Sequence, residues 1–180
     1  MRTDIKIAIS GRSGCGNTTI SKMIAEELGL RFINFTFRSL AEERSLDFKK
    51  ILELAATDDS WDKEVDKRQV MLAREGVING EGGCVLGSRL AIWMLEEADL
   101  KVYLNASPEV RVQRIIKREG GNFEEITAFT AERDRQDHER YLRIYNIDTN
   151  NYKFADLLLE TDNMTPQQIV DLIIEKTKEI

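Results

Sequence analysis

Histidine, cysteine and proline are scarce in this chain, and each shortage excludes a class of protein. His138 is the only histidine among 180 residues, which nearly excludes a His-based catalytic triad or a His-rich metal site. The two cysteines, Cys15 and Cys84, lack metal-type spacing and are expected to be free thiols. With only two prolines there is no candidate linker, and the length fits a single domain, residues 1–180.

The chain also lacks an excess of basic residues, and it contains no long apolar run. The net charge of -6 and the pI near 5.0 argue against broad nucleic-acid binding, which requires a basic surface. No apolar run approaches the ~18 residues that span a bilayer. The segment Met1-Arg2-Thr3-Asp4 leads into a predicted strand and does not resemble a signal peptide. We therefore expect a cytoplasmic monomer that binds neither nucleic acid nor membrane.

The chain does contain a glycine-rich loop at residues 11–19. It follows the apolar run 5–9 and precedes apolar residues spaced three and four apart, an order that predicts strand, turn and helix. In that context a G-x-x-x-x-G-K-[ST] pattern is a phosphate-binding loop, because backbone N–H groups and a helix N-terminus converge on phosphate oxygens. The predicted nucleotide-binding residues are Gly11, Arg12, Ser13, Gly14, Cys15, Gly16, Asn17, Thr18 and Thr19.

One residue breaks this pattern. Asn17 stands where the motif places a lysine that reaches the outer phosphates, so a neutral amide replaces a positive charge. Thr18 occupies the position whose hydroxyl ligates Mg²⁺, whereas Thr19 could merely bond to backbone. The alternative is an ordinary glycine-rich turn, but the spacing of the glycines and the flanking elements favour phosphate binding.

The remaining pattern predicts an α/β fold with a five-stranded parallel sheet flanked by helices. Strands are predicted at the run before the loop and at 30–34, 84–87, 100–105 and 156–159. Residues 37–76 read as a helical insertion, and helices are predicted from Pro108, across 123–145 and at the C-terminus. Strands separated by helices imply right-handed parallel crossovers.

Arginines recur on the two helices that precede the last strand. Their three- and four-residue spacing places them on shared helix faces, and a glycine pair joins the helices, so the segment could close over phosphates as a lid. Interspersed acidic residues leave open the alternative of solvated helices with surface salt bridges. The candidates for neutralising transferred phosphate are Arg114, Arg118, Arg133, Arg135 and Arg140.

Seven motifs in this order and spacing resemble one known family, the short, archaeal-type cytidylate kinases. These belong to the nucleoside monophosphate kinase group of P-loop kinases, and the variant form found in spirochaetes is the most similar. The resemblance covers almost the whole chain. It rests on residues 11–19, Phe37-Arg38, Asp66-Lys67-Arg68-Gln69, Arg89-Leu90-Ala91-Ile92-Trp93-Met94, Ala98-Asp99-Leu100-Lys101, Pro108-Glu109-Val110-Arg111 with Lys117-Arg118-Glu119-Gly120, and Arg140-Tyr141 with Ile144-Tyr145-Asn146-Ile147-Asp148.

The resemblance implies transfer of the ATP γ-phosphate, with Mg²⁺, to CMP or dCMP. It implies a core at 1–35, 77–110 and 146–180, a monophosphate-binding helical insertion at about 36–76 and a lid at about 111–145. In such a kinase Arg38 and Arg89 would hold the acceptor phosphate, while Asp66 and Arg68 would lie near its sugar and base.

Two departures from the family pattern leave alternatives open. Besides Asn17, the sequence lacks the acidic residue that usual members carry near Gly87. The candidate substitutes for the lysine are Arg12, Lys22 or a lid arginine, and Glu81 or Asp99 could assist the metal through water. The alternatives to an active cytidylate kinase are a catalytically impaired nucleotide-binding module and a kinase for another nucleoside monophosphate or small metabolite.

Overall fold

The computed structural model describes residues 4–180, except for the side chain of Val77. Residues 1–3 lie outside the described residues. They begin the expected core, and the expectation about a signal peptide concerns them. Helices and strands alternate along the chain as predicted. The elements are β1 Lys6–Gly11, α1 Asn17–Leu28, β2 Arg31–Ile33, α2 Phe37–Glu43, α3 Phe48–Ala55, α4 Ser60–Ile78, β3 Cys84–Gly87, α5 Ala91–Met94, β4 Leu100–Asn105, α6 Pro108–Glu119, α7 Phe123–Tyr145, β5 Leu157–Glu160 and α8 Pro166–Thr177.

The five strands form one parallel sheet in the order β2-β3-β1-β4-β5, which confirms the predicted architecture. The central strand β1 pairs with β3 from Lys6↔Cys84 and with β4 from Ile7↔Leu100. Strands β2 and β3 lie on one side of β1 in the sheet, and β4 and β5 lie on the other. Ligands of open α/β sheets bind at such a switch point, beyond the carboxyl ends of the strands.

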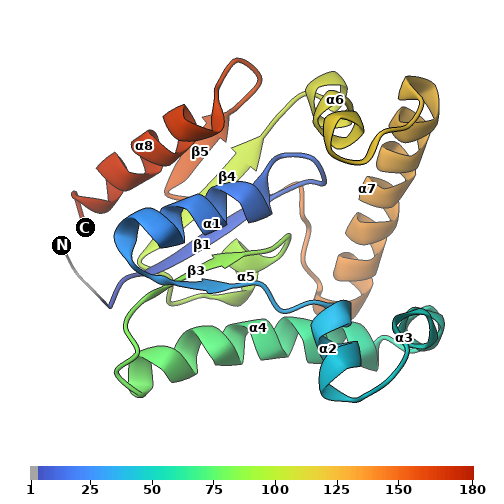
Figure 1. Cartoon of the computed structure of the whole chain (residues 1–180), viewed down its shortest axis with the longest axis horizontal. Helices are drawn as coiled ribbons and strands as arrows, with labels where there is room; N and C mark the ends of the chain where they lie inside the picture. Colours follow the sequence, from blue (N-terminus) through green and yellow to red (C-terminus); the bar gives the residue numbers. More distant parts are fainter. Residues whose placement is uncertain (1–3) are drawn as a thin grey trace.

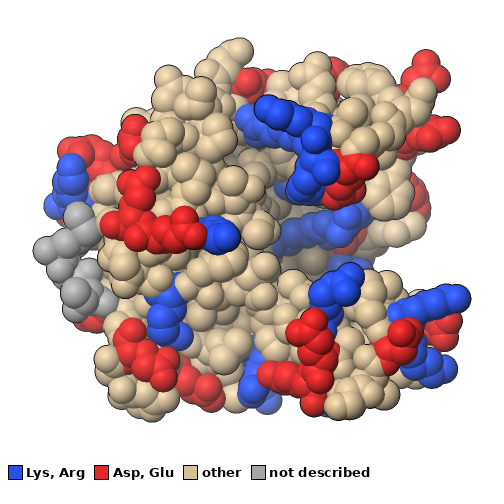
Figure 2. Space-filling model, viewed as in Figure 1, with Lys and Arg blue, Asp and Glu red and all other residues tan. Residues whose placement is uncertain are grey.

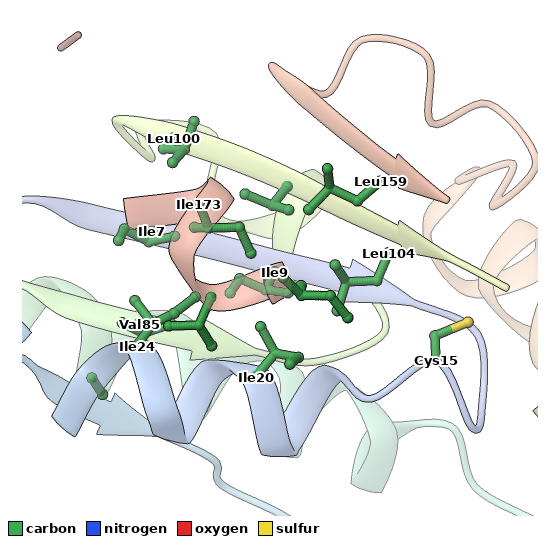
Figure 3. Packing of buried hydrophobic residues seen from close by; sticks show 14 of the residues in the cluster. Ile7, Ile9, Cys15, Ile20, Ile24, Val85, Leu100, Leu104, Leu159 and Ile173 are labelled. Atoms are coloured by element: carbon green, nitrogen blue, oxygen red, sulfur yellow. The ribbon is translucent and has the colours of Figure 1, made fainter. Parts of the chain in front are cut away.

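Helices cover both faces of the sheet (Figure 1). On one face, α1 and α8 pack over the aliphatic side chains of β1, β4 and β5, with Ile7, Ile9, Ile24 and Leu104 fully buried (Figure 3). On the other face, α4 and α5 contribute to a second buried cluster around Cys84 and Leu86 of β3. Burial of each such side chain contributes about 1.5–3 kcal/mol. These packed layers hold the carboxyl ends of β1 and β3 in place.

The segment between β2 and β3 is helical, as the scattered apolar pattern predicts. Thr36 begins α2 with a capping box and Asp47 caps α3 through two backbone N–H groups. Helices α2, α3 and α4 pack around a small core of their own, which includes Leu40, Ile51 and Val65. The insertion therefore has internal support, and Figure 1 shows α2 and α3 on the same side of the sheet as α7.

Helices α6 and α7 pack against each other and are joined by the glycines at 120 and 121. Ser107 caps α6 ahead of Pro108, as predicted, and Asn122 caps α7. The second half of α7 contacts the core through Asp137 and the buried Tyr141, whereas its first half projects beyond the sheet. The expected limits of the insertion and the lid stay predictions.

Candidate active site

The glycine-rich loop joins β1 to α1 and leaves the helix N-terminus open. Gly14 and Gly16 adopt φ values of 85° and 99°, a region that L side chains rarely adopt. The N-cap of α1 is Gly16, no side chain caps this end, and its first turn has no acidic residue. The first N–H groups of a helix lack intrahelical acceptors, so they are available to an anion. The loop therefore has the backbone geometry of a phosphate site.

A cleft of about 1000 Å³ extends from this loop to α4, between α2 and α3 on one side and α7 on the other. Figure 2 shows Lys and Arg side chains gathered along the recess in the right half of the molecule. Gly11 and Cys15 are buried behind the loop and do not line the cleft. The predicted site residues that do line it are Arg12, Ser13, Gly14, Gly16, Asn17, Thr18, Thr19, Asp66, Arg89, Arg118, Arg133 and Arg140.

The Asn17 side chain folds back onto its own loop. Its Nδ2 donates to the carbonyl of Gly11 at 2.6 Å, and its Oδ1 is buried without a hydrogen-bond partner. The amide thus stabilises the start of the loop but supplies no positive charge to the cleft. Arg12 also extends from the loop, where Nη2 donates to Asn150 Oδ1 at 2.8 Å.

Arg133 differs from the other arginines that line the cleft. It forms no ion pair or hydrogen bond with any residue of the described chain, 4–180. The side chain is accessible to solvent, yet it lies in a concave site where neighbouring atoms displace part of its water. This desolvation, followed by the charge of Arg89, lowers the pKa of Arg133. An anion between the two guanidinium groups would relieve both effects, so this point of the cleft favours phosphate.

Arg89 and Arg140, one predicted acceptor arginine and one predicted lid arginine, are joined by carboxylates into one chain of charges. Asp137 of α7 pairs with Arg89, at the end of β3, and with Arg140 at 2.8 Å. Arg140 in turn lies 3.3 Å from Asp62 of α4. Burial raises the pKa of the Asp62 carboxyl, and Arg140 opposes the shift. The chain of charges fixes two arginines on the cleft wall while leaving Arg133 unpaired.

Besides Gly11 and Cys15, four of the predicted site residues lie outside the cleft lining. Arg114 donates to the Thr161 carbonyl at 2.6 Å and links α6 to the segment after β5. Arg135 is exposed and pairs with two glutamates of its own helix. Arg38 lies over the Phe48 ring at 4.4 Å, and Arg68 pairs with Glu43 at 3.4 Å. Their contacts with nucleotides stay predictions.

The structure also narrows the candidates for the missing charges. Lys22 lies outside the cleft lining and pairs at the surface with Glu26, and its role as the lysine substitute stays a prediction. Asp99 accepts from the N–H of Lys6, at the start of β1, and Glu81 precedes β3 beside Arg31. Both carboxylates lie at the amino ends of the strands, whereas the loop lies at the carboxyl end of β1. The length of β1 therefore separates them from the loop. The expectation that they assist the metal is therefore wrong.

Arg111 is a buried contact to the loop. The three- and four-residue spacing places it on the same helix face as Arg114 and Arg118, but it is not among the predicted site residues. Its side chain is 4 % exposed, Nη1 donates to the Ser13 carbonyl at 3.0 Å, and the same atom lies 2.8 Å from Asp134 of α7. By holding that carbonyl, Arg111 keeps it turned away from the cleft. Asp134, Asp137 and Tyr141 follow one another at helical spacing, and this periodicity was the available signal for the anchored face of α7.

We expect Arg111→Met to weaken ATP binding about tenfold, because a freed Ser13 carbonyl competes with the phosphates for the loop amides. Isothermal calorimetry with ATP measures the effect, and Arg111→Lys should recover part of it. Equal losses of affinity for ATP and for the monophosphate would instead indicate general destabilisation of the cleft.

The far end of the cleft is formed by α4 and the end of α7. Asp66 Oδ2 accepts a hydrogen bond from the Tyr145 hydroxyl at 2.8 Å. Burial raises the pKa of Asp66 to about 6, and the hydrogen bond from Tyr145 opposes the shift. Aromatic Phe35 and Phe37 line the same end. This end is less basic than the loop end and offers apolar walls with polar edges.

The donors present fit a Mg²⁺ ion that arrives with nucleotide phosphates. Thr18 lines the cleft at the head of α1, and Mg²⁺ in such sites keeps phosphate and water oxygens as most of its ligands. Residues 4–180 contain no cluster of three or more His, Cys, Asp or Glu side chains that could bind a metal alone. A Cβ on Gly87 would lie 2.3 Å from Ser21 Oγ, so α1 leaves no space there for a carboxylate.

Known proteins are similar in sequence to this chain over nearly its full length. Residues 6–163 match the model of the Cytidylate kinase-like family. Cytidylate kinase 2 of Borreliella afzelii is 44% identical over 173 residues, which cover 94% of each chain. Cytidylate kinase of Pyrococcus horikoshii is 38% identical over 169 residues, covering 93% of this chain and 85% of the relative.

Solved structures show the same fold at low sequence identity. Shikimate kinase from Bacteroides thetaiotaomicron superposes with a TM-score of 0.61 at 17% identity, covering 97% of this chain and 98% of the other. Deoxyadenosine kinase from M. mycoides, with dCTP bound, gives 0.52 at 16% identity, covering 98% and 100%. No helix within residues 4–180 is both long and apolar enough to cross a bilayer. With the P-loop kinase fold and the family match in agreement, this chain belongs to the cytidylate kinase-like family.

Proposed function

We propose that this protein transfers the γ-phosphate of ATP to CMP or dCMP. The observation that carries the proposal is one continuous cleft with two anion sites. The loop and the open N-terminus of α1 form the first, Arg89 with Arg140 forms the second, and the unpaired Arg133 lines the same cleft and is affected by the charge of Arg89. A phosphate donor and a phosphate acceptor can therefore lie in one cavity. The names of the relatives supply the cytosine nucleotide as acceptor.

In the proposed complex, ATP places its β-phosphate against the backbone amides from Ser13 to Thr18. The acceptor phosphate binds Arg89 and Arg140 after displacing the carboxylate of Asp137. An acceptor phosphate oxygen is the nucleophile, so the protein aligns it with the γ-phosphate and needs no covalent intermediate. Closure of α6 and α7 over the substrates would exclude water, which could otherwise accept the phosphate in place of the nucleotide.

Arg133 supplies the charge that Asn17 does not. Its side chain has no described partner to give up, so it can move toward the γ-phosphate without breaking an ion pair. Arg118, whose ion-pair partner within residues 4–180 is the neighbouring Glu119 at the surface, reinforces it from α6. Thr18, together with the nucleotide phosphates, would hold Mg²⁺, which would supply further positive charge against the phosphates.

A kinase assay with product identification tests the proposal. Purified protein is incubated with ATP, Mg²⁺ and one of CMP, dCMP, UMP or AMP, and the nucleotides are separated by chromatography. We expect CDP and dCDP with matching ADP, at turnover of about 1–100 s⁻¹ for the preferred acceptor. ATP binding without phosphorylation of any acceptor would instead support the impaired nucleotide-binding module, and turnover with UMP or AMP alone would change the acceptor.

The raised pKa of Asp66 predicts an acid limb in the activity profile. We propose that the ionised carboxylate accepts a hydrogen bond from the acceptor nucleoside. Protonation below a pKa of about 6 removes that acceptor, so kcat/KM for CMP should fall as pH drops through this value. The charged groups that act on it besides Tyr145 are Asp62, Asp137 and Arg140.

The phosphate of CMP titrates in the same range, so the comparison with Asp66→Asn isolates the protein group. The variant should lose activity at pH 8 and show a shallower acid limb. A wild-type profile that coincides in shape with that of Asp66→Asn would show that Asp66 does not titrate during acceptor binding.

A further inference from the structure

Gln69 is a buried amide on the cleft wall whose orientation is fixed. The residue lies on α4, is 8 % exposed and lines the cleft. Its Nε2 donates to the backbone carbonyl of Phe35 at 2.6 Å. A carbonyl oxygen can only accept, so the nitrogen of the amide must face Phe35 and the oxygen must face away. Within the described chain, Gln69 Oε1 has no hydrogen-bond donor.

Asp66 lies one helical turn before Gln69 and lines the same cleft. Residues three apart on a helix have Cβ atoms about 5–6 Å apart, so both side chains present oxygens to one region. One Asp66 oxygen already accepts from Tyr145, and the carboxylate retains further acceptor capacity. The wall thus offers hydrogen-bond acceptors from two residues, and Phe35 and Val65 supply apolar surface beside them.

We propose that Gln69 is a specificity-determining residue whose Oε1 accepts a hydrogen bond from the exocyclic amino group of the acceptor base, with Asp66 as the second acceptor. The amino group of cytosine carries two hydrogens and can satisfy both. Uracil presents a carbonyl oxygen at the same position, which would face two acceptors without a proton between them. The Phe35 carbonyl prevents the Gln69 amide from rotating to offer a donor, so the wall discriminates against the keto base.

This inference rests on the proposed function, because it requires a nucleoside monophosphate in the cleft. The chain of charges from Arg89 through Asp137 and Arg140 to Asp62 leads from the acceptor-phosphate site to α4. A monophosphate bound at Arg89 therefore has its base directed along the wall that carries Asp66 and Gln69.

The test compares CMP with the ribonucleotide of pyrimidin-2-one, which has the same ring but lacks the amino group. Wild-type kcat/KM should be at least 100-fold higher for CMP, because the analogue leaves two acceptors unpaired. Gln69→Met retains the side-chain length but removes the amide. It should lower kcat/KM for CMP about tenfold and leave the value for the analogue within about threefold. The preference for CMP over UMP should fall by a similar factor.

Gln167→Met, an identical substitution on the surface of α8, is the matched control and should leave both ratios unchanged. Equal losses for CMP and for the analogue in Gln69→Met would overturn the proposal, because a purely structural role affects both substrates alike. If that variant does not fold, the wild-type comparison decides, since equal use of CMP and the analogue also overturns it. Absence of turnover with every nucleotide would instead refute the proposed kinase function.

Discussion

Arg133→Met is expected to lower kcat for CMP phosphorylation by about 10³-fold while changing the affinity for ATP by less than about threefold. An arginine that meets the transferring phosphate contributes at about this magnitude, and its contacts form mainly in the transition state. Arg133 is suited to the role because it lines the cleft, lacks a described partner and lies near Arg89. Steady-state kinetics give kcat, and calorimetry gives ATP affinity.

Two other arginines of α7 make this result interpretable. Arg143→Met removes an exposed arginine that pairs with Asp59, and it should retain near-wild-type kcat. Arg135→Met distinguishes the prediction made from the sequence pattern from the prediction made from the structure. The pattern includes Arg135 among the catalytic arginines, whereas its exposed pairs with Glu132 and Glu139 predict a small effect. A loss of kcat in Arg135→Met as large as that in Arg133→Met would contradict the structural assignment.

Arg89→Met should raise KM for CMP and lower kcat/KM for CMP by about 100-fold, since a charge-assisted contact to the acceptor phosphate is lost. KM for ATP should change little, because the loop and α1 bind the donor without Arg89. The variant also leaves Asp137 with only Arg140 as its ion-pair partner in the described chain. Initial rates at varied CMP and at varied ATP give the two constants separately.

Arg89→Met with Asp137→Asn removes the complication of the orphaned carboxylate. If acceptor binding is the cause, the double variant keeps the high KM for CMP. Recovery of wild-type KM in the double variant would mean that Arg89 serves only to neutralise Asp137.

The fold was predictable because its signals are local and periodic. The strand at 84–87, the strand at 100–105 and the helix at 123–145 have the bounds that the sequence predicts. Two further predicted strands, 30–34 and 156–159, differ by one residue at each end, at Arg31–Ile33 and Leu157–Glu160, and the predicted run at 5–9 corresponds to β1, Lys6–Gly11. The periodic spacing of apolar residues indicates which faces of the strands and helices are buried, and glycine-containing turns indicate where these elements end. Strand order and register required the structure, because they depend on long-range packing.

The candidate site was predictable in part. The loop follows from a motif with fixed spacing, and its open helix end agrees with that motif. Spacing could place arginines on a helix face, but it could not show which carboxylates would engage them. Asp137 pairs with Arg89 across 48 residues, and Arg111 reaches Ser13 across 98, so neither contact has a local signal. Arg114, on the same predicted stripe as Arg118, instead binds the segment after β5.

The buried polar contacts of α4 show the same limit. Gln69 reads in the sequence as one residue of a charged helix, and only its hydrogen bond to Phe35 fixes its amide. The Tyr145 hydroxyl reaches Asp66 from the end of α7, across 79 residues. Such contacts decide which polar groups are free to meet a ligand.

The central claim is that Arg133 provides the positive charge that Asn17 lacks, and a double-mutant cycle between the two positions tests it most directly. Two residues that supply the same charge must be coupled, whereas independent residues have additive effects. We predict that Asn17→Lys raises kcat at least about tenfold in the Arg133→Met background and changes wild-type kcat by less than about threefold. The same factor in both backgrounds would contradict the claim.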